Sequence, residues 1–203
     1  MLIAQLLKPI VLLVTLSTLA IGLVRAQPYE NEEARALLFP PANCPAPCWQ
    51  GIRPDDTSIQ EAFALLRAHP WVAEIDERFY DIYTANWQWS AQRPPLIQET
   101  NSNGLWFSSH GRVTSVEILT HIRLGDVRLL LGRPAWTSRF PLGNEFLQVT
   151  ELYPEYHLTV FYSLPCPASM DDLWQVEVGL LWQDISGVRG QAEASATGTL
   201  LRC

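Results

Sequence analysis

A helix-and-strand pattern that occurs twice limits most strongly what this chain of 203 residues can fold into. Residues 57–72 and 122–136 align on their paired leucines, Leu65-Leu66 and Leu130-Leu131. Each segment has apolar residues at helical spacing, closes with a proline and then a tryptophan, and is followed by strand-like sequence. Internal similarity of this kind is typical of a duplicated unit. We therefore predict an α+β fold with two tandem units, each a helix packed on an antiparallel sheet.

Turn residues and helix caps set the expected boundaries of the helices and strands. The first helix should start near Thr57 or Ser58, where a capping box is available, and the second should run from about residue 123 to Gly132. Closely spaced turn residues between the expected strands favour antiparallel meanders. The chain then divides into an export segment, a lead-in tied by a disulfide, two helix–sheet units and a tail, with bounds 1–26, 27–56, 57–120, 121–183 and 184–203.

The N-terminus has the pattern of an export signal. Residues 9–24 are almost entirely apolar, they follow Lys8, and they lead into Val24-Arg25-Ala26, which suits signal peptidase. The alternative is an uncleaved membrane anchor, because about 23 residues can cross a bilayer. Both interpretations place residues 27–203 outside the cytoplasm, with membrane contact only through the N-terminal segment.

Four cysteines, an even number in an exported chain, predict two disulfides. Three pairings are open, and we favour Cys44–Cys48 together with Cys166–Cys203. A redox site is disfavoured, because thiol oxidoreductases use Cys-x-x-Cys at the start of a helix, whereas this sequence has Cys-Pro-Ala-Pro-Cys. The spacing of the four cysteines does not fit a zinc site either.

The charge balance argues against nucleic acid as a partner. The formal net charge is −7, and beyond residue 26 the chain has 12 basic and 21 acidic residues, a net charge of −9. A surface this acidic repels phosphate backbones.

No catalytic, metal or cofactor residue is predicted. The histidines lack the spacing of a metal site; they are His69, His110, His121 and His157. The sequence has no Gly-x-Ser-x-Gly elbow. The acidic pairs at 55–56 and 171–172 are interpreted as helix caps and turns.

The chain has eight tryptophans, of which Trp87 and Trp89 stand two apart and so share one face of a strand. If exposed, they would form a stacking platform for sugars or an anchor for a partner protein. If buried, they would fill the space between helix and sheet. Their polar neighbours leave both interpretations open, and we take Trp87 and Trp89 as the candidate binding residues.

The motifs Cys-Trp-Gln-Gly-Ile-Arg-Pro at 48–54, Leu-Gly-Asp-Val at 124–127 and Leu-Gly-Arg-Pro at 131–134 resemble a group of uncharacterised exported bacterial proteins. More distantly, the helix-to-strand unit is similar to the tandem repeats of secreted β-lactamase inhibitor proteins and of small outer-membrane assembly lipoproteins. That likeness implies a binding protein that grips a partner with a sheet face or hairpin loops. The chain lacks the lipobox of those lipoproteins, and in its first unit Arg67-Ala68-His69 replaces the glycine.

These features together predict an exported, non-catalytic binding protein that contacts a protein or an envelope component through a sheet face. Two alternatives stay open. One is an envelope hydrolase with its site between the two units, and the other is a carbohydrate-binding module that uses Trp87 and Trp89.

Overall fold

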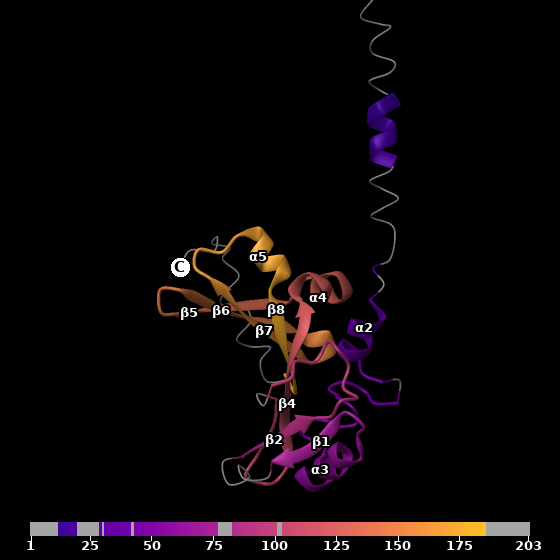
Figure 1. Cartoon of the computed structure of the whole chain (residues 1–203), viewed down its shortest axis with the longest axis vertical. Helices are drawn as coiled ribbons and strands as arrows, with labels where there is room; N and C mark the ends of the chain where they lie inside the picture. The colour runs from indigo at the N-terminus through magenta and orange to yellow at the C-terminus, as the bar shows by residue number, and fades with distance from the viewer. Residues whose placement is uncertain are drawn as a thin grey trace, which may run out of the picture. The chain divides into compact units, whose positions relative to one another are not determined.

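The computed structural model describes residues 12–19, 29, 31–41, 43–76, 83–100 and 103–185 (Figure 1). The chain divides at residue 30 into two units, and the sheet belongs to the second. Residues 12–19 are helical, while the rest of the predicted export segment lies outside the described ranges. Among the helices that the structure describes, none combines the length and the apolar character needed to cross a membrane.

Helices and antiparallel strands alternate along the second unit, which confirms the α+β class. The helices are α2 (Glu32–Leu38), α3 (Ile59–Ala68), α4 (Leu124–Leu131) and α5 (Met170–Gln175), with a 3₁₀ turn η2 at Pro154–Tyr156. The strands are β1 (Val72–Asp76), β2 (Thr84–Trp89), β3 (Gly104–Phe107), β4 (Val113–Arg123), β5 (Trp136–Leu142), β6 (Phe146–Tyr153), β7 (Leu158–Pro165) and β8 (Glu177–Gln183).

All eight strands belong to one sheet, in the order β1-β2-β3-β4-β8-β7-β6-β5. Helix α3 precedes the first four strands and helix α4 the last four. The last strands of the two sets, β4 and β8, pair with each other at the centre of the sheet. Their pairing runs from Ser115 opposite Gln183 to Arg123 opposite Glu177. The first strand of each set, β1 or β5, therefore forms an edge. In Figure 1 the long strand β4 connects the part of the sheet beside α3 with the part beside α4 and α5.

Local signals place the two main helices. Ser58 caps α3 and forms a capping box with Glu61, as the sequence predicts. The α3 residues Ile59, Ala62, Phe63 and Leu66 are buried, at the spacing that lets one helical face lie on the sheet. Helix α4 ends at Gly132, whose positive φ of 82° suits glycine.

One segment differs from the sequence prediction. The alternation from residue 173 to 182 predicts a single strand, but α5 occupies Met170–Gln175 and β8 begins only at Glu177. Ser169 and Asp172 form a capping box that starts this helix, and a local cap of this kind outweighs a weak alternating pattern. Strand β5 was also missed, because Pro141 interrupts its pattern.

The hydrophobic core lies between the helices and one face of the sheet. Alternate strand residues point into it, including Val116, Ile118, Val160 and Leu180, and the buried residues of α2 and α3 join the same cluster. The intervening strand residues point to the opposite face, which we call the open face.

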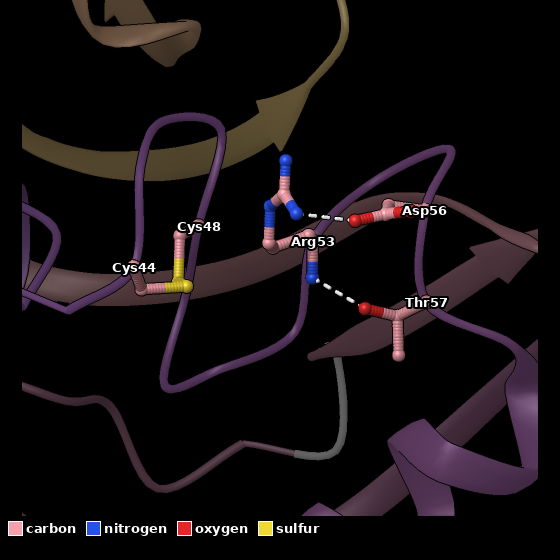
Figure 2. The surroundings of a disulfide bond; sticks show 5 residues. All are labelled: Cys44, Cys48, Arg53, Asp56 and Thr57. Atoms are coloured by element: carbon pink, nitrogen blue, oxygen red, sulfur yellow. Dashed lines mark hydrogen bonds and ion pairs between the residues drawn. A yellow bond between two sulfur atoms is a disulfide. The ribbon is translucent and has the colours of Figure 1, made fainter.

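The lead-in that precedes α3 is part of this core. The predicted Cys44–Cys48 disulfide is confirmed (Figure 2). Residues 49–52 then make a tight turn, with positive φ at Gln50 and Gly51, that buries Trp49 and Ile52. The motif that starts at Cys48 therefore has a structural role.

Beyond the turn, Arg53 is held through both its backbone and its side chain. Its backbone N–H donates to the Thr57 hydroxyl at 2.8 Å, and its guanidinium pairs with Asp56. The other predicted disulfide, Cys166–Cys203, involves Cys203, which lies outside the described residues. The backbone N–H of Cys166 donates to the Glu145 carbonyl at 2.8 Å, so Cys166 lies beside the β5–β6 turn.

Candidate binding face of the sheet

Trp87 and Trp89 do not form an exposed platform, so this part of the sequence prediction is wrong. The register of β2 turns both residues toward the core, and Trp87 is only 1% exposed. Its ring stacks on Trp49 with centroids 5.7 Å apart. Trp89 is half-buried and meets Trp87 edge-on, with an angle of 84° between the rings. The two rings therefore do not form the exposed, coplanar platform that a carbohydrate-binding module built on this pair would need.

The polar neighbours of these tryptophans, Asn86 and Gln88, lie on the open face instead. The strand pairings define this face as rows that cross the sheet. One row runs through Asp76, Asn86, Gly104, Glu117, Leu181, Thr159, Leu152 and Trp136, each opposite the next on the neighbouring strand. This row reaches both edges of the sheet, and within it Thr159 and Leu152 are each only 5% exposed.

Three large apolar side chains are exposed on the open face at the β5–β6 hairpin, and we call them the hairpin patch. They are Phe140, 65% exposed, Leu142, 43% exposed, and Phe146, 49% exposed. Leu142 lies directly opposite Phe146 across the hairpin. The patch was not predicted from the sequence because β5 was not predicted, although Phe140 and Leu142 alternate as strand residues do.

The middle of the open face is mostly uncharged. From residues 115–119 of β4 across to β5 it carries serine, threonine, glutamine and apolar residues, without lysine or arginine. The Phe161 ring lies over Gly179 on the next strand, where an added Cβ would meet ring atoms at 2.2 Å.

Two acidic residues lie on this face near its centre: Glu177 of β8, opposite Arg123, and Glu117 of β4, which has an aromatic neighbour. The Trp106 indole lies close enough to the Glu117 carboxyl to lower its pKa, and the Trp106 side chain is 47% exposed. Gly104 lies opposite Glu117 on β3, and the Asn86 Oδ1 lies 3.0 Å from where a Cβ at Gly104 would stand. Burial raises the pKa of Glu117, and the neighbouring Trp106 indole opposes the shift.

The side chain of another glutamate, Glu151, lies on the core side and is fully buried. It pairs with Arg128 from α4 and accepts hydrogen bonds from the Tyr153 hydroxyl at 3.0 Å and the Tyr162 hydroxyl at 2.9 Å. A carboxylate with three donors is satisfied rather than reactive. We interpret this network as the link that fixes α4 to β6 and β7.

The two tyrosines of this network predict a loss of stability at alkaline pH. Burial, and next the Glu151 charge, raise the pKa of Tyr153 and of Tyr162 above the ordinary 10.0. Below pH 10 both folded and unfolded chains keep these protons. Above it the unfolded chain loses them first, so stability should fall by about 1.4 kcal/mol per pH unit for each tyrosine.

Urea unfolding between pH 8 and pH 11 measures this slope. Tyr153→Phe removes one of the two titrating groups and should reduce the alkaline slope by about that amount. An identical slope in the wild type and in Tyr153→Phe would contradict the assignment.

No family model, no curated protein and no solved structure matches this chain. Among the residues that the structure describes, no group of three histidine, cysteine, aspartate or glutamate side chains is arranged to hold a metal ion.

Proposed function

We propose that this chain is a non-catalytic binding protein that holds a protein partner on the open face of its sheet. The single observation that carries the proposal is the exposed hairpin patch of Phe140, Leu142 and Phe146 on that face. The Cys44–Cys48 disulfide supports a location in an oxidising, extracytoplasmic compartment.

The composition of the open face fits protein recognition. Centres of protein interfaces are rich in aromatic residues and poor in charge, and a few aromatic anchors supply most of the binding energy. Phe140 and Phe146 would act as such anchors. The mostly uncharged middle of the face would give the complementary surface around them.

The order of the strands supports the same proposal. We infer that the sheet arose by duplication of one helix-plus-four-strand unit, because α3 and α4 each precede four strands and the two sets join through β4 and β8. The buried residues of α3 and α4 belong to one core on one side of the sheet. The two units therefore share a single open face on the other side.

Site-specific photo-crosslinking of the full chain in its native cells tests this function. A benzophenone amino acid at Phe140 should give a covalent adduct of one defined mass. The control position is Leu129, which is equally apolar and 55% exposed but lies on α4, on the helix side. We expect little or no adduct from Leu129.

Competition with unlabelled protein completes the experiment. Wild-type chain added in excess should suppress the Phe140 adduct, whereas chain carrying Phe140→Ser and Phe146→Ser should not. Equal adducts from both positions, or equal suppression by both competitors, would sink the proposal. The absence of any adduct at Phe140 would do the same.

A further inference from the structure

We propose that a cavity at one end of the β5–β6 ladder binds a free amino acid with a large apolar side chain. The cavity has a volume of about 330 Å³, and its lining comes from two segments, the end of α4 up to the start of β5 and the end of β6 through η2. It lies at the end of the ladder away from the hairpin patch. The inference therefore goes beyond the proposed function and does not depend on it.

Two prolines end the ladder where the cavity lies. The last pair of the ladder is Trp136 opposite Leu152, and the Ala135 N–H donates to the Leu152 carbonyl just outside it, at 2.9 Å. Two residues further on, the same register would place Pro134 opposite Pro154. Proline has no N–H to donate, so the pairing stops there. One segment then continues into η2, and the other comes from α4.

The next positions in this register hold opposite charges. Arg133 and Glu155 come one residue beyond the prolines on the two segments, and both side chains line the cavity. Both residues are exposed, and neither side chain has a hydrogen-bond or ion-pair partner among the residues that the structure describes. A cation and an anion therefore line one cavity without pairing with each other. A ligand that carries both a carboxylate and an ammonium group would complement both of them.

The rest of the lining is mainly apolar and aromatic. Leu131 and Tyr156 are half-buried and pack against the core. Phe39 of α2 meets the Tyr156 ring edge-on, with centroids 5.4 Å apart, and so holds it in place. The Tyr153 hydroxyl already donates to Glu151 at 3.0 Å, which leaves the Tyr153 ring for the cavity. Walls of this kind suit an apolar ligand side chain, while a few polar groups fix its orientation.

The size of the cavity favours a single amino acid over a longer peptide. Ligand pockets in proteins span roughly 300–1,000 Å³, and this cavity lies at the lower end of that range. A free amino acid carries both charges on one carbon, whereas the end of a peptide carries only one of them. Arg133 would bind the carboxylate through two parallel hydrogen bonds, Glu155 would bind the ammonium group, and the side chain would lie against Tyr156.

Titration of the ¹⁵N-labelled full chain with phenylalanine tests the cavity, followed by the backbone amide NMR signals of Glu155 and Tyr156. Phenylalanine should shift these signals saturably. N-acetylphenylalanine lacks the ammonium charge, and phenylalaninamide lacks the carboxylate. Each should bind about tenfold more weakly, because it leaves one charged side chain without its partner. The absence of a saturable shift with phenylalanine, or equal affinity for either analogue, would overturn the proposal.

Two matched variants assign the charges to their residues. Glu155→Gln should bind phenylalanine about tenfold more weakly than the wild type and should no longer distinguish it from N-acetylphenylalanine. Arg133→Gln should show the same loss and should no longer distinguish phenylalanine from phenylalaninamide. Both residues are exposed, so both variants should unfold at the urea concentration of the wild type.

Glu145→Gln is the control, because Glu145 is also exposed but lies at the turn at the other end of the ladder. This variant should bind phenylalanine as the wild type does. Unchanged affinity in either cavity variant, or an equal loss in Glu145→Gln, would mean that Arg133 and Glu155 do not hold the ligand. If these two side chains only pair with each other in solution, phenylalanine will give no saturable shift, and the proposal is wrong.

This proposal and the proposed function fail separately. If phenylalanine binds but no adduct forms at Phe140, the amino-acid cavity stands and the proposed function falls. If the adduct forms but phenylalanine gives no saturable shift, the proposed function stands and the cavity falls.

Discussion

Trp49→Ala is expected to lower the free energy of unfolding by about 3–5 kcal/mol. The Trp49 side chain is fully buried. Its ring stacks on Trp87 and lies 6.3 Å from Trp182, centroid to centroid. Trp49 thereby joins the disulfide lead-in to β2 and to β8. Its loss would leave a cavity among these three segments that rigid neighbours cannot fill.

Urea unfolding at pH 7, followed by circular dichroism, measures this loss. Trp106→Ala removes an indole of equal size from the open face, and we expect it to cost about 1 kcal/mol or less. The comparison therefore isolates burial from side-chain size. Equal losses for the two variants would mean that the lead-in is not part of the core.

Arg128→Met is expected to have an effect of similar size, about 3–5 kcal/mol. The substitution keeps the length of the aliphatic stem but removes the cation that pairs with Glu151. Glu151 is fully buried, so its carboxylate would keep only the hydrogen bonds from Tyr153 and Tyr162. A buried charge without a counter-ion is far less stable than the pair.

The double variant Arg128→Met with Glu151→Gln decides whether charge or packing causes this loss. Glutamine can still accept from the tyrosine hydroxyls and needs no cation. The double variant should therefore be more stable than Arg128→Met alone, although it carries one more substitution. If the two losses simply add, the pair contributes through packing and the network interpretation is wrong.

Local interactions explain the parts of the fold that the sequence predicts well. The α3 helix follows from the Ser58 and Glu61 capping box and from apolar residues on one face. The Cys44–Cys48 bond closes a loop of residues close in sequence, so its pairing needs no knowledge of the fold. The short helix α5 and the edge strand β5 were harder to predict, because their sequence patterns are brief and interrupted.

The candidate site depended on contacts between segments far apart in sequence. Alternation indicates that Trp87 and Trp89 share a face of β2, but it does not tell which face. Trp49 decides this, because its ring stacks on Trp87 from the lead-in and leaves Trp87 in the core. The hairpin patch and the pair of Trp106 and Glu117 likewise became visible only once strand register was known.

By itself, the amino-acid sequence determined the α+β class, the main helix caps and the disulfide loop before Trp49, since each depends on residues close along the chain. The tertiary structure alone decided which face of the sheet is open and which aromatic residues lie on it. The physical reason is that a strand has two equivalent sides, and only the helices that pack against one of them make the sides different.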